Sequence, residues 1–288
     1  MAVYQSTRIS TVNSILYYNR IAMKKILLIL SMVTILFSCE KGSRLDMEDN
    51  RQVTLTYDVE APVEFQVKST GEGSAVNALW YGVYHKKDNG SYVYISEMSA
   101  HVPVTDSSLR ISVPIVLFKD QEYKIIFVAQ HVSGNTYTYT VDGGGNMSLN
   151  PQAAITDGEQ LDAFVYWEET GIIKNDYKRN ITLTRPLAQI NITTEATEKP
   201  SSIDVEVTGT AQSYNIFTGS YSDQTSNVSI NGLQCSGSAL GTVYFLTAPY
   251  SVSVKMNLKY ENPSKEKTIE IPYVSVAPNF KTNIKGNL

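Results

Sequence analysis

The feature that most constrains the fold is an alternation of apolar and polar residues that recurs along most of the chain. It begins in QVTLTYDVE, Gln52–Glu60. The apolar residues that share one face of this run are Val53, Leu55, Tyr57 and Val59. Similar runs follow, separated by Gly, Pro and Asn, and no long segment with a helical period intervenes. Since successive side chains of a strand point to opposite faces, the pattern predicts an all-β chain of antiparallel sheets.

Two further signals support strands. Asn89-Gly90 lies between ALWYGVYHK (Ala78–Lys86) and SYVYISEM (Ser91–Met98), and Asn-Gly between alternating runs predicts a hairpin. The chain holds 19 Tyr against 8 Phe and 2 Trp, and Tyr suits a sheet with one face in water.

Prolines inside strand-like runs predict edges, bulges or strand ends, at Pro103, Pro114, Pro186 and Pro272. The stretch 150–178 has little alternation and is expected to carry a short helical turn.

A leader precedes these runs. In MKKILLILSMVTILFSCEKGS, Met23–Ser43, two lysines come before the apolar segment Ile26–Phe37. This segment is too short to span about 30 Å of hydrocarbon, but it suits a secretory signal. Its end resembles a bacterial lipobox, with Ser38 before the cut and Cys39 as the lipidated residue, although Phe37 departs from the usual residue there. The alternative is an ordinary secretion signal with a chance cysteine.

This leader sets the predicted organisation of the chain. Residues 1–22 are expected to be a mis-called upstream extension, because a signal peptide begins at its basic region. The segments that follow are a signal peptide at 23–38, a polar tether at 39–51, and two β-sandwiches at 52–178 and 179–288.

Composition excludes some functions. The chain is 42% hydrophobic and 18% charged, with a net charge of −4, whereas a nucleic-acid surface needs a basic face. Of its two cysteines, lipidation of Cys39 would leave Cys235 without an intramolecular partner. Cys235 is therefore predicted to be a small core residue rather than a reactive thiol.

No catalytic constellation is recognisable. The three histidines lack metal-ligand spacing and are predicted to be surface strand residues: His85, His101 and His131. Glu168 and Glu169 lie beside Trp167, but neighbours on a strand point to opposite faces and could not flank one glycosidic bond. We therefore expect no enzyme activity, no metal and no cofactor.

One stretch carries a family resemblance. ITLTRPLAQINITT, Ile181–Thr194, resembles the Leu-x-Arg-Pro-Phe-Ala-Gln-Leu-Asn segment of Bacteroidales fimbrillin-like proteins, the subunits of the type V pilus. The matching residues are Arg185, Pro186, Ala188 and Gln189. ALWYGVY, YKIIFVAQ, DAFVYW and NFKTNIKGNL resemble other segments of that family, in the same order, so that the similarity spans Gln52 to Leu288.

The resemblance implies a fold and a function. It implies two transthyretin-like β-sandwiches, with Arg185, Pro186 and Gln189 at the domain junction and Arg185 reaching a carboxylate or carbonyl there. It also implies a lipoprotein precursor exported to the outer membrane surface, which serves as a structural or anchoring subunit of a fimbria. Its partners would be other pilin subunits and the outer membrane.

In the resembled family a protease cuts after the first strand, which leaves, and a neighbour's strand fills the gap. The corresponding strand here is Gln52–Glu60, with the four apolar residues named above as its inward-facing side chains. The candidate cleavage site is Lys68-Ser69, where many relatives have Arg. Either a protease that accepts Lys matures the subunit, or the strand stays and Cys39 makes the chain an anchor.

The alternative function is a surface lipoprotein that binds a glycan or a host protein and does not polymerise. Sugars commonly stack on exposed aromatic rings, and this interpretation would use Trp80, Trp167 and the segment Tyr137–Thr140.

Overall fold

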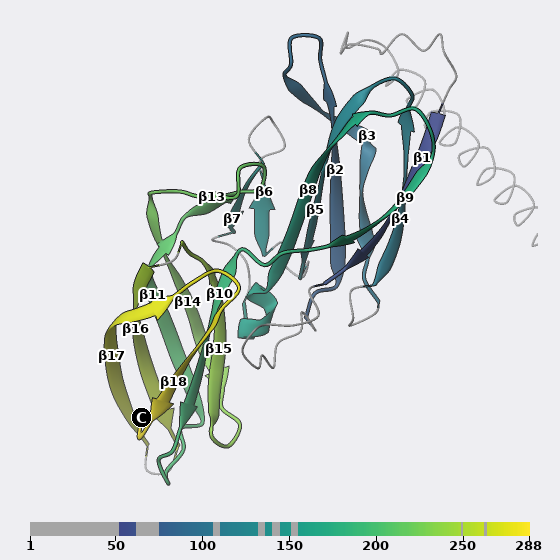
Figure 1. Cartoon of the computed structure of the whole chain (residues 1–288). Coiled ribbons are helices and arrows are strands. Elements are labelled where there is room, and N and C mark those ends of the chain that lie inside the picture. The colour runs from purple at the N-terminus through teal and green to yellow at the C-terminus, as the bar shows by residue number, and fades with distance from the viewer. Residues whose placement is uncertain are drawn as a thin grey trace, which may run out of the picture. The chain divides into compact units, whose positions relative to one another are not determined.

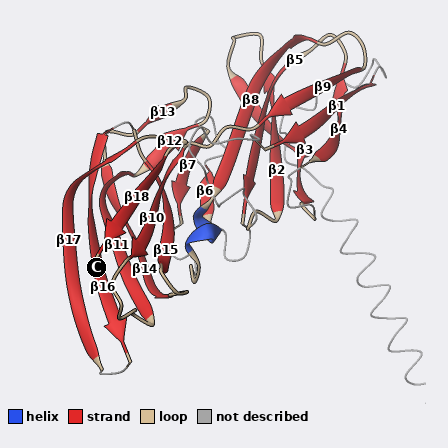
Figure 2. Cartoon of the chain, turned by 60° about the horizontal axis from the view of Figure 1, so that its bottom comes forward, coloured by secondary structure: helices blue, strands red, loops and turns tan. Residues whose placement is uncertain are grey.

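The structure is a computed structural model that describes residues 52–61, 75–105, 110–131, 136–139, 145–150, 155–248, 250–261 and 264–288. Within these ranges the chain is built of strands, with one 3₁₀ turn, η1 (Gly158–Leu161), drawn in blue in Figure 2. The predicted all-β class is confirmed. The predicted signal peptide, Cys39, Lys68 and Ser69 lie outside the described residues. No helix in the described part is long and apolar enough to cross a membrane.

The first described strand lies in the middle of a three-stranded sheet (Figure 1). β1 (Gln52–Glu60) pairs antiparallel with β4 (Ile111–Phe118) and parallel with β9 (Tyr177–Thr182). In this register Leu55 lies between Ile115 and Tyr177. Backbone hydrogen bonds therefore hold β1 along both of its edges.

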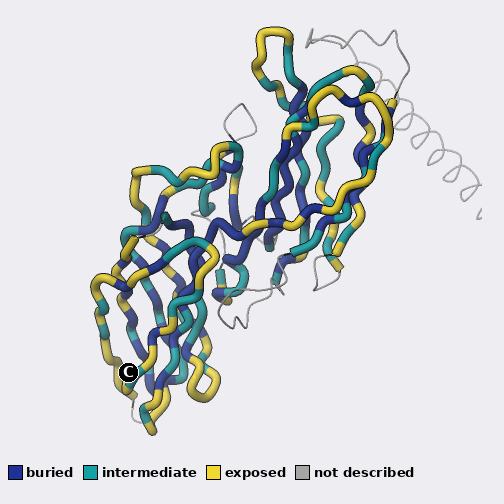
Figure 3. The backbone as a smooth tube through the Cα atoms, in the orientation of Figure 1, coloured by how far each residue is buried: buried dark blue, intermediate teal, exposed yellow. Residues whose placement is uncertain are grey.

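A four-stranded sheet faces this one across a buried core. Its order is β3 (Tyr92–Pro103), β2 (Ala78–Lys86), β5 (Glu122–Gln130) and β8 (Ala163–Ile172). The predicted hairpin joins β2 and β3, with Gly90 at φ 80° donating its N–H to the Lys87 carbonyl at 2.8 Å. Apolar residues of both sheets form one buried cluster, seen as dark blue strands in Figure 3.

The second half of the chain repeats this arrangement. β10 (Leu187–Thr194) lies between β15 (Ala239–Leu246), its antiparallel partner, and β18 (Lys281–Gly286), its parallel partner. The four-stranded sheet has the order β14 (Thr225–Gln234), β11 (Ser202–Ala211), β16 (Tyr250–Tyr260) and β17 (Lys265–Val276). In chain order β1, β2, β3, β4, β5, β8 and β9 thus correspond to β10, β11, β14, β15, β16, β17 and β18.

A small fifth sheet joins insertions from both halves. Its order is β13 (Ser220–Tyr221), β12 (Ser213–Asn215), β7 (Asn146–Leu149) and β6 (Tyr137–Tyr139). β6 and β7 interrupt the link from β5 to β8, and β12 and β13 interrupt the link from β11 to β14. The pairing of β7 with β12 therefore ties the two halves together.

The predicted boundary between two sandwiches, at 178/179, falls within β9, which pairs with β1. The alternation across 179–195 is thus divided into β9 and β10, with a buried Arg185 between them. The division into two domains stays a prediction, and the pairing of β9 favours a boundary between Thr182 and Leu187.

The prolines lie where the sequence predicts. Pro103 ends β3, and Pro186 immediately precedes β10. Pro114 lies in β4 and Pro272 in β17, and both strands are at sheet edges. Beside Pro272 the pairing with β16 shifts register, so the missing N–H coincides with a bulge.

Candidate functional site

β1 is the central strand of its sheet, with one face in the core and the other partly exposed. Each of its inward side chains is at most 2% exposed: Val53, Leu55, Tyr57 and Val59. The residues between them are half-buried. If β1 left, the facing edges of β4 and β9 would lose their hydrogen-bond partners, and four apolar positions in the core would be empty.

A buried carboxylate meets β1 in the middle of this core. The Tyr57 hydroxyl donates to Glu168 Oε1 at 2.6 Å, and the Tyr166 hydroxyl donates to Oε2 at 3.0 Å. Arg179 Nη1 lies 2.5 Å from Oε2, and the Tyr177 hydroxyl lies 3.1 Å from that of Tyr57. We call Glu168, Tyr166, Tyr177 and Arg179 the Glu168 cluster, which joins β8 and β9 to β1.

The tyrosines of this site act as neutral donors. Burial, then the hydrogen bond to Glu168, raises the pKa of Tyr57 well above its usual value. Burial, with the nearby Glu168 charge, raises the pKa of Tyr166 to about 12. Arg179 is half exposed and supplies the positive charge that compensates the carboxylate of Glu168, which is 7% exposed.

Glu169 does not take part in this cluster. It lies on the opposite face of β8, where its Oε1 is 3.2 Å from Lys124 Nζ. The predicted separation of Glu168 and Glu169 onto two faces is therefore confirmed, and the two carboxylates do not face a common substrate.

The outward side of β1 is held only by exposed contacts. Asp58 pairs with Lys178 at 2.7 Å and accepts a hydrogen bond from the Ser112 hydroxyl at 2.9 Å. The Thr54 N–H donates to Asp176 Oδ1 at 2.9 Å. Exposed pairs of this kind are screened by solvent and contribute little to stability.

The junction motif found in the sequence surrounds a second buried charge. Arg185 donates from Nε and Nη2 to the two carboxylate oxygens of Asp162, each at 2.6 Å, and neither side chain is exposed. The guanidinium also lies over the Phe164 ring at 4.4 Å. Burial raises the pKa of Asp162 to about 7, and Arg185 acts in the opposite direction.

η1 packs against the second sandwich beside this pair. Gly158 lies so close to the backbone of β15 that an added Cβ would be 1.5 Å from the Thr242 carbonyl oxygen. The Tyr244 hydroxyl, also from β15, donates to Glu159 Oε2 at 3.1 Å. Gln189, the third residue of the junction motif, pairs with Tyr244 across β10 and β15 and is fully buried.

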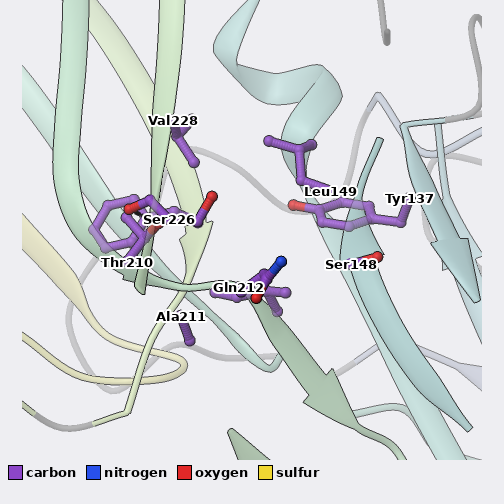
Figure 4. Close-up of a pocket in the computed structure, with 10 residues that line it drawn as sticks. Tyr137, Ser148, Leu149, Thr210, Ala211, Gln212, Ser226 and Val228 are labelled. Carbon is purple, nitrogen blue, oxygen red and sulfur yellow. Dashed lines mark hydrogen bonds between the residues drawn. The ribbon is translucent and has the colours of Figure 1, made fainter. Parts of the chain in front are cut away.

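A cavity of about 270 Å³ lies between the small sheet and the second sandwich (Figure 4). It is lined by Tyr137, Ser148, Leu149, Thr210, Ala211, Gln212, Ser226, Val228, Phe245 and Leu246. Tyr137 is the one titratable residue among these, and its hydroxyl already donates to the Leu161 carbonyl at 2.7 Å. The lining therefore offers no acid–base pair. In the described ranges, no three His, Cys, Asp or Glu side chains group as a metal site would require.

Two predictions about exposure are wrong. Trp80 and Tyr137, which the glycan-binding interpretation would use, are 5% and 3% exposed, because the small sheet covers that face and Tyr139 stacks on Trp80 at 4.4 Å. His85 is buried rather than at the surface, and its Nε2 lies 2.7 Å from Gln121 Oε1.

Sequence reasoning missed the Glu168 cluster, and it expected Arg185 to reach a carboxylate or carbonyl without identifying Asp162 as that partner. The one available signal was Tyr57, the only inward residue of its strand with a hydroxyl group. A tyrosine buried in a core usually finds a hydrogen-bond partner, which here comes from strands far away in the sequence.

Residues 46–288 match the model of a family of unknown function, DUF6562, and the chain belongs to this family. Comparison with curated protein sequences finds no match.

Several solved structures are similar to this chain. The fimbrial anchor protein Mfa2 from Porphyromonas gingivalis is 12% identical, with a TM-score of 0.46 over 77% of this chain and 82% of that one. A fimbrial assembly protein from Parabacteroides distasonis is 14% identical, with a TM-score of 0.42 over 81% and 90%. The C-terminally truncated tip fimbrial protein Mfa3 from Porphyromonas gingivalis is 11% identical, with a TM-score of 0.42 over 81% and 94%.

Proposed function

We propose that this chain is a structural or anchoring subunit of a surface fimbria, and that its subunits assemble by strand exchange at the position of β1. The observation that carries the proposal is the place of β1: it is central in its sheet, but one covalent connection, residues 61–77, joins it to β2. A single cut there would remove the covalent link between β1 and β2 and leave β1 held by non-covalent contacts.

Such a cut would leave an adhesive groove. β4 and β9 would present unpaired N–H and C=O groups, and the positions of the four inward side chains would be open. An extended segment from a neighbour can satisfy the backbone groups, while its alternate side chains fill the pockets. The unpaired backbone groups and the empty apolar positions would therefore favour binding of a neighbour's strand, and so ordered assembly.

Maturation and anchoring follow from the leader. We propose that Cys39 carries lipid (palmitate among its acyl chains) and holds the precursor at the outer membrane surface, and that cleavage between Lys68 and Ser69 releases β1. Burial of acyl chains contributes about 0.8 kcal/mol per CH₂, so several chains make a durable anchor. The variant Cys39→Ala is expected to leave the detergent phase on phase partitioning. Retention of that variant through residues 23–38 would contradict the lipid anchor.

The test is mass spectrometry of the protein from native surface material, with negative-stain images of cells with and without it. A mature N-terminus at Ser69 in fibres supports a polymerising subunit, and a lipidated Cys39 on assembled material supports an anchor. A Lys68→Gln variant provides the control, because it should block the first outcome alone. Intact monomers without fibres would contradict both roles and favour the alternative, a surface lipoprotein that binds a glycan or host protein.

A further inference from the structure

We propose that the Glu168 cluster makes strand exchange specific: it selects an incoming strand that places a tyrosine where β1 places Tyr57. We call the site that this tyrosine would occupy, beside the Glu168 cluster, the socket. The inference rests on the proposed strand exchange and names a property of the partner strand: a tyrosine hydroxyl among otherwise apolar inward residues. Three of the four inward positions of β1 are aliphatic, and any strand with alternating apolar residues could fill them. The position of Tyr57 differs because its pocket ends in a carboxylate.

The shape of this pocket requires an aromatic ring. The ring of Tyr57 packs 5.1 Å from that of Phe127 and 6.3 Å from that of Tyr177, centroid to centroid, and its hydroxyl reaches Glu168 beyond them. A leucine or valine at this position would stop short of the carboxylate and leave a cavity between the rings. The incoming side chain must therefore have the length of a tyrosine.

The charge of the pocket requires a neutral donor. Glu168 is already paired with Arg179, and Tyr166 donates to the same carboxylate oxygen, Oε2. The other oxygen, Oε1, accepts from Tyr57 at 2.6 Å and from Tyr177 only at 3.5 Å. A phenylalanine would leave Oε1 of the buried carboxylate without its short hydrogen bond, and a lysine or arginine would bring a second cation to a carboxylate that is already paired.

The socket would also fix the register of the incoming strand. If a strand of the β1 sequence slipped by one residue, Thr56 or Asp58 would enter the socket, and the carboxylate of Asp58 would face that of Glu168. A slip by two residues would bring in Leu55 or Val59, neither of which can donate a hydrogen bond. Both slipped registers lose the hydrogen bond from the tyrosine to Glu168. The socket would therefore favour the correct register and also disfavour the wrong ones.

The test uses the full chain with a specific protease site placed between residues 62 and 74. After the cut, an excess of fluorescent peptide QVTLTYDVE competes with the separated strand, and binding is followed by anisotropy. The matching peptides carry Tyr57→Phe at the socket and, as the control, Thr56→Val on the outward face. We expect the Phe peptide to bind at least about tenfold more weakly, because a buried acceptor loses its donor, and the control within about twofold.

The outcomes separate the inference from the function on which it rests. Equal binding of the Tyr and Phe peptides would overturn the inference and leave strand exchange intact. Failure of every peptide to bind the cut chain would overturn strand exchange, and the inference with it. In a chain carrying Glu168→Gln, the preference for Tyr over Phe should shrink, and an unchanged preference would also overturn the role of Glu168. The peptide series on the unsubstituted chain decides the question even if that variant does not fold.

Discussion

β1 and β10 occupy equivalent places in the two halves, and their surroundings differ. Each is the middle strand of three, antiparallel to one neighbour and parallel to the other. β1 alternates between buried and wet residues, whereas the first four residues of β10 are all buried. The difference arises outside β10, because η1 packs against β15 beside it and the Arg185–Asp162 pair lies just before it.

Topology alone does not distinguish β1, the strand proposed to exchange, from β10. β10 is continuous with the chain at both ends, through the link from β9 and the link to β11, and is buried on two faces over its first half. β1 is buried on one face and needs one cut to be separated. Its outward contacts are exposed, so the strand is held by its backbone pairing, its inward side chains and the Glu168 cluster.

The largest expected effect comes from breaking the ion pair beside β10. Arg185→Met should lower the free energy of unfolding by about 3–5 kcal/mol, because it leaves the Asp162 carboxylate buried without its partner. Denaturant unfolding measures this loss. Replacing both residues, with Asp162→Leu added, should recover most of it. A loss of unfolding free energy below about 1 kcal/mol for the single variant would show that this ion pair does not stabilise the region around β10.

Removing core volume should distinguish the two strands only after cleavage. Leu55→Ala and Ile190→Ala each remove a fully buried side chain, and each should cost about 2–5 kcal/mol in the uncut chain. In a chain cut between residues 62 and 74, Leu55→Ala should speed the release of β1, measured by size-exclusion of the released fragment. Equal acceleration by Ile190→Ala would contradict the distinction between the strands.

A substitution in η1 tests whether this turn stabilises the second half by packing against β15. Gly158→Ala forces a methyl group against the Thr242 carbonyl and should cost about 1–3 kcal/mol as η1 moves away. Gly286→Ala is the matched control, because its added carbon would meet only ordinary contacts. Thermal unfolding of the two variants compares them, and equal stability would mean that η1 does not hold this surface.

The smallest effect is expected on the outward face of β1. Asp58→Asn removes an exposed pair with Lys178 and should leave denaturant unfolding unchanged within error, at low and at high salt. Glu168→Gln, a buried substitution on β8 of the facing sheet, should lower the free energy of unfolding measurably. A measurable loss for Asp58→Asn would mean that the outward face contributes to holding β1.

The sequence predicted local features better than distant contacts. Alternation identified β1, and Asn89-Gly90 identified the β2–β3 hairpin, because both signals are contained in a few residues. The segment that forms β14 is harder to recognise as a strand, because its exposed face is rich in Ser, Thr and Asn, which are also typical of loops. β8 was missed since both of its faces are covered near its start, which removes the alternation.

The candidate site was predictable only in part for the same reason. The apolar residues of β1 could be listed from their spacing, but the partners of Tyr57 could not. Glu168 lies on β8 of the facing sheet, 111 residues from Tyr57, and Tyr177 and Arg179 reach the site because β9 pairs parallel with β1. A parallel pairing of distant strands leaves no short sequence signal.

We propose that β1 can leave its sheet while the equivalent β10 cannot. Hydrogen exchange followed by mass spectrometry, on the full chain before and after a cut between residues 62 and 74, measures this directly. The cut is expected to remove protection from the facing edges of β4 and β9 as β1 dissociates, while β15 and β18 stay protected on either side of β10. Full protection of β4 and β9 after the cut, or loss of protection in both halves together, would contradict it.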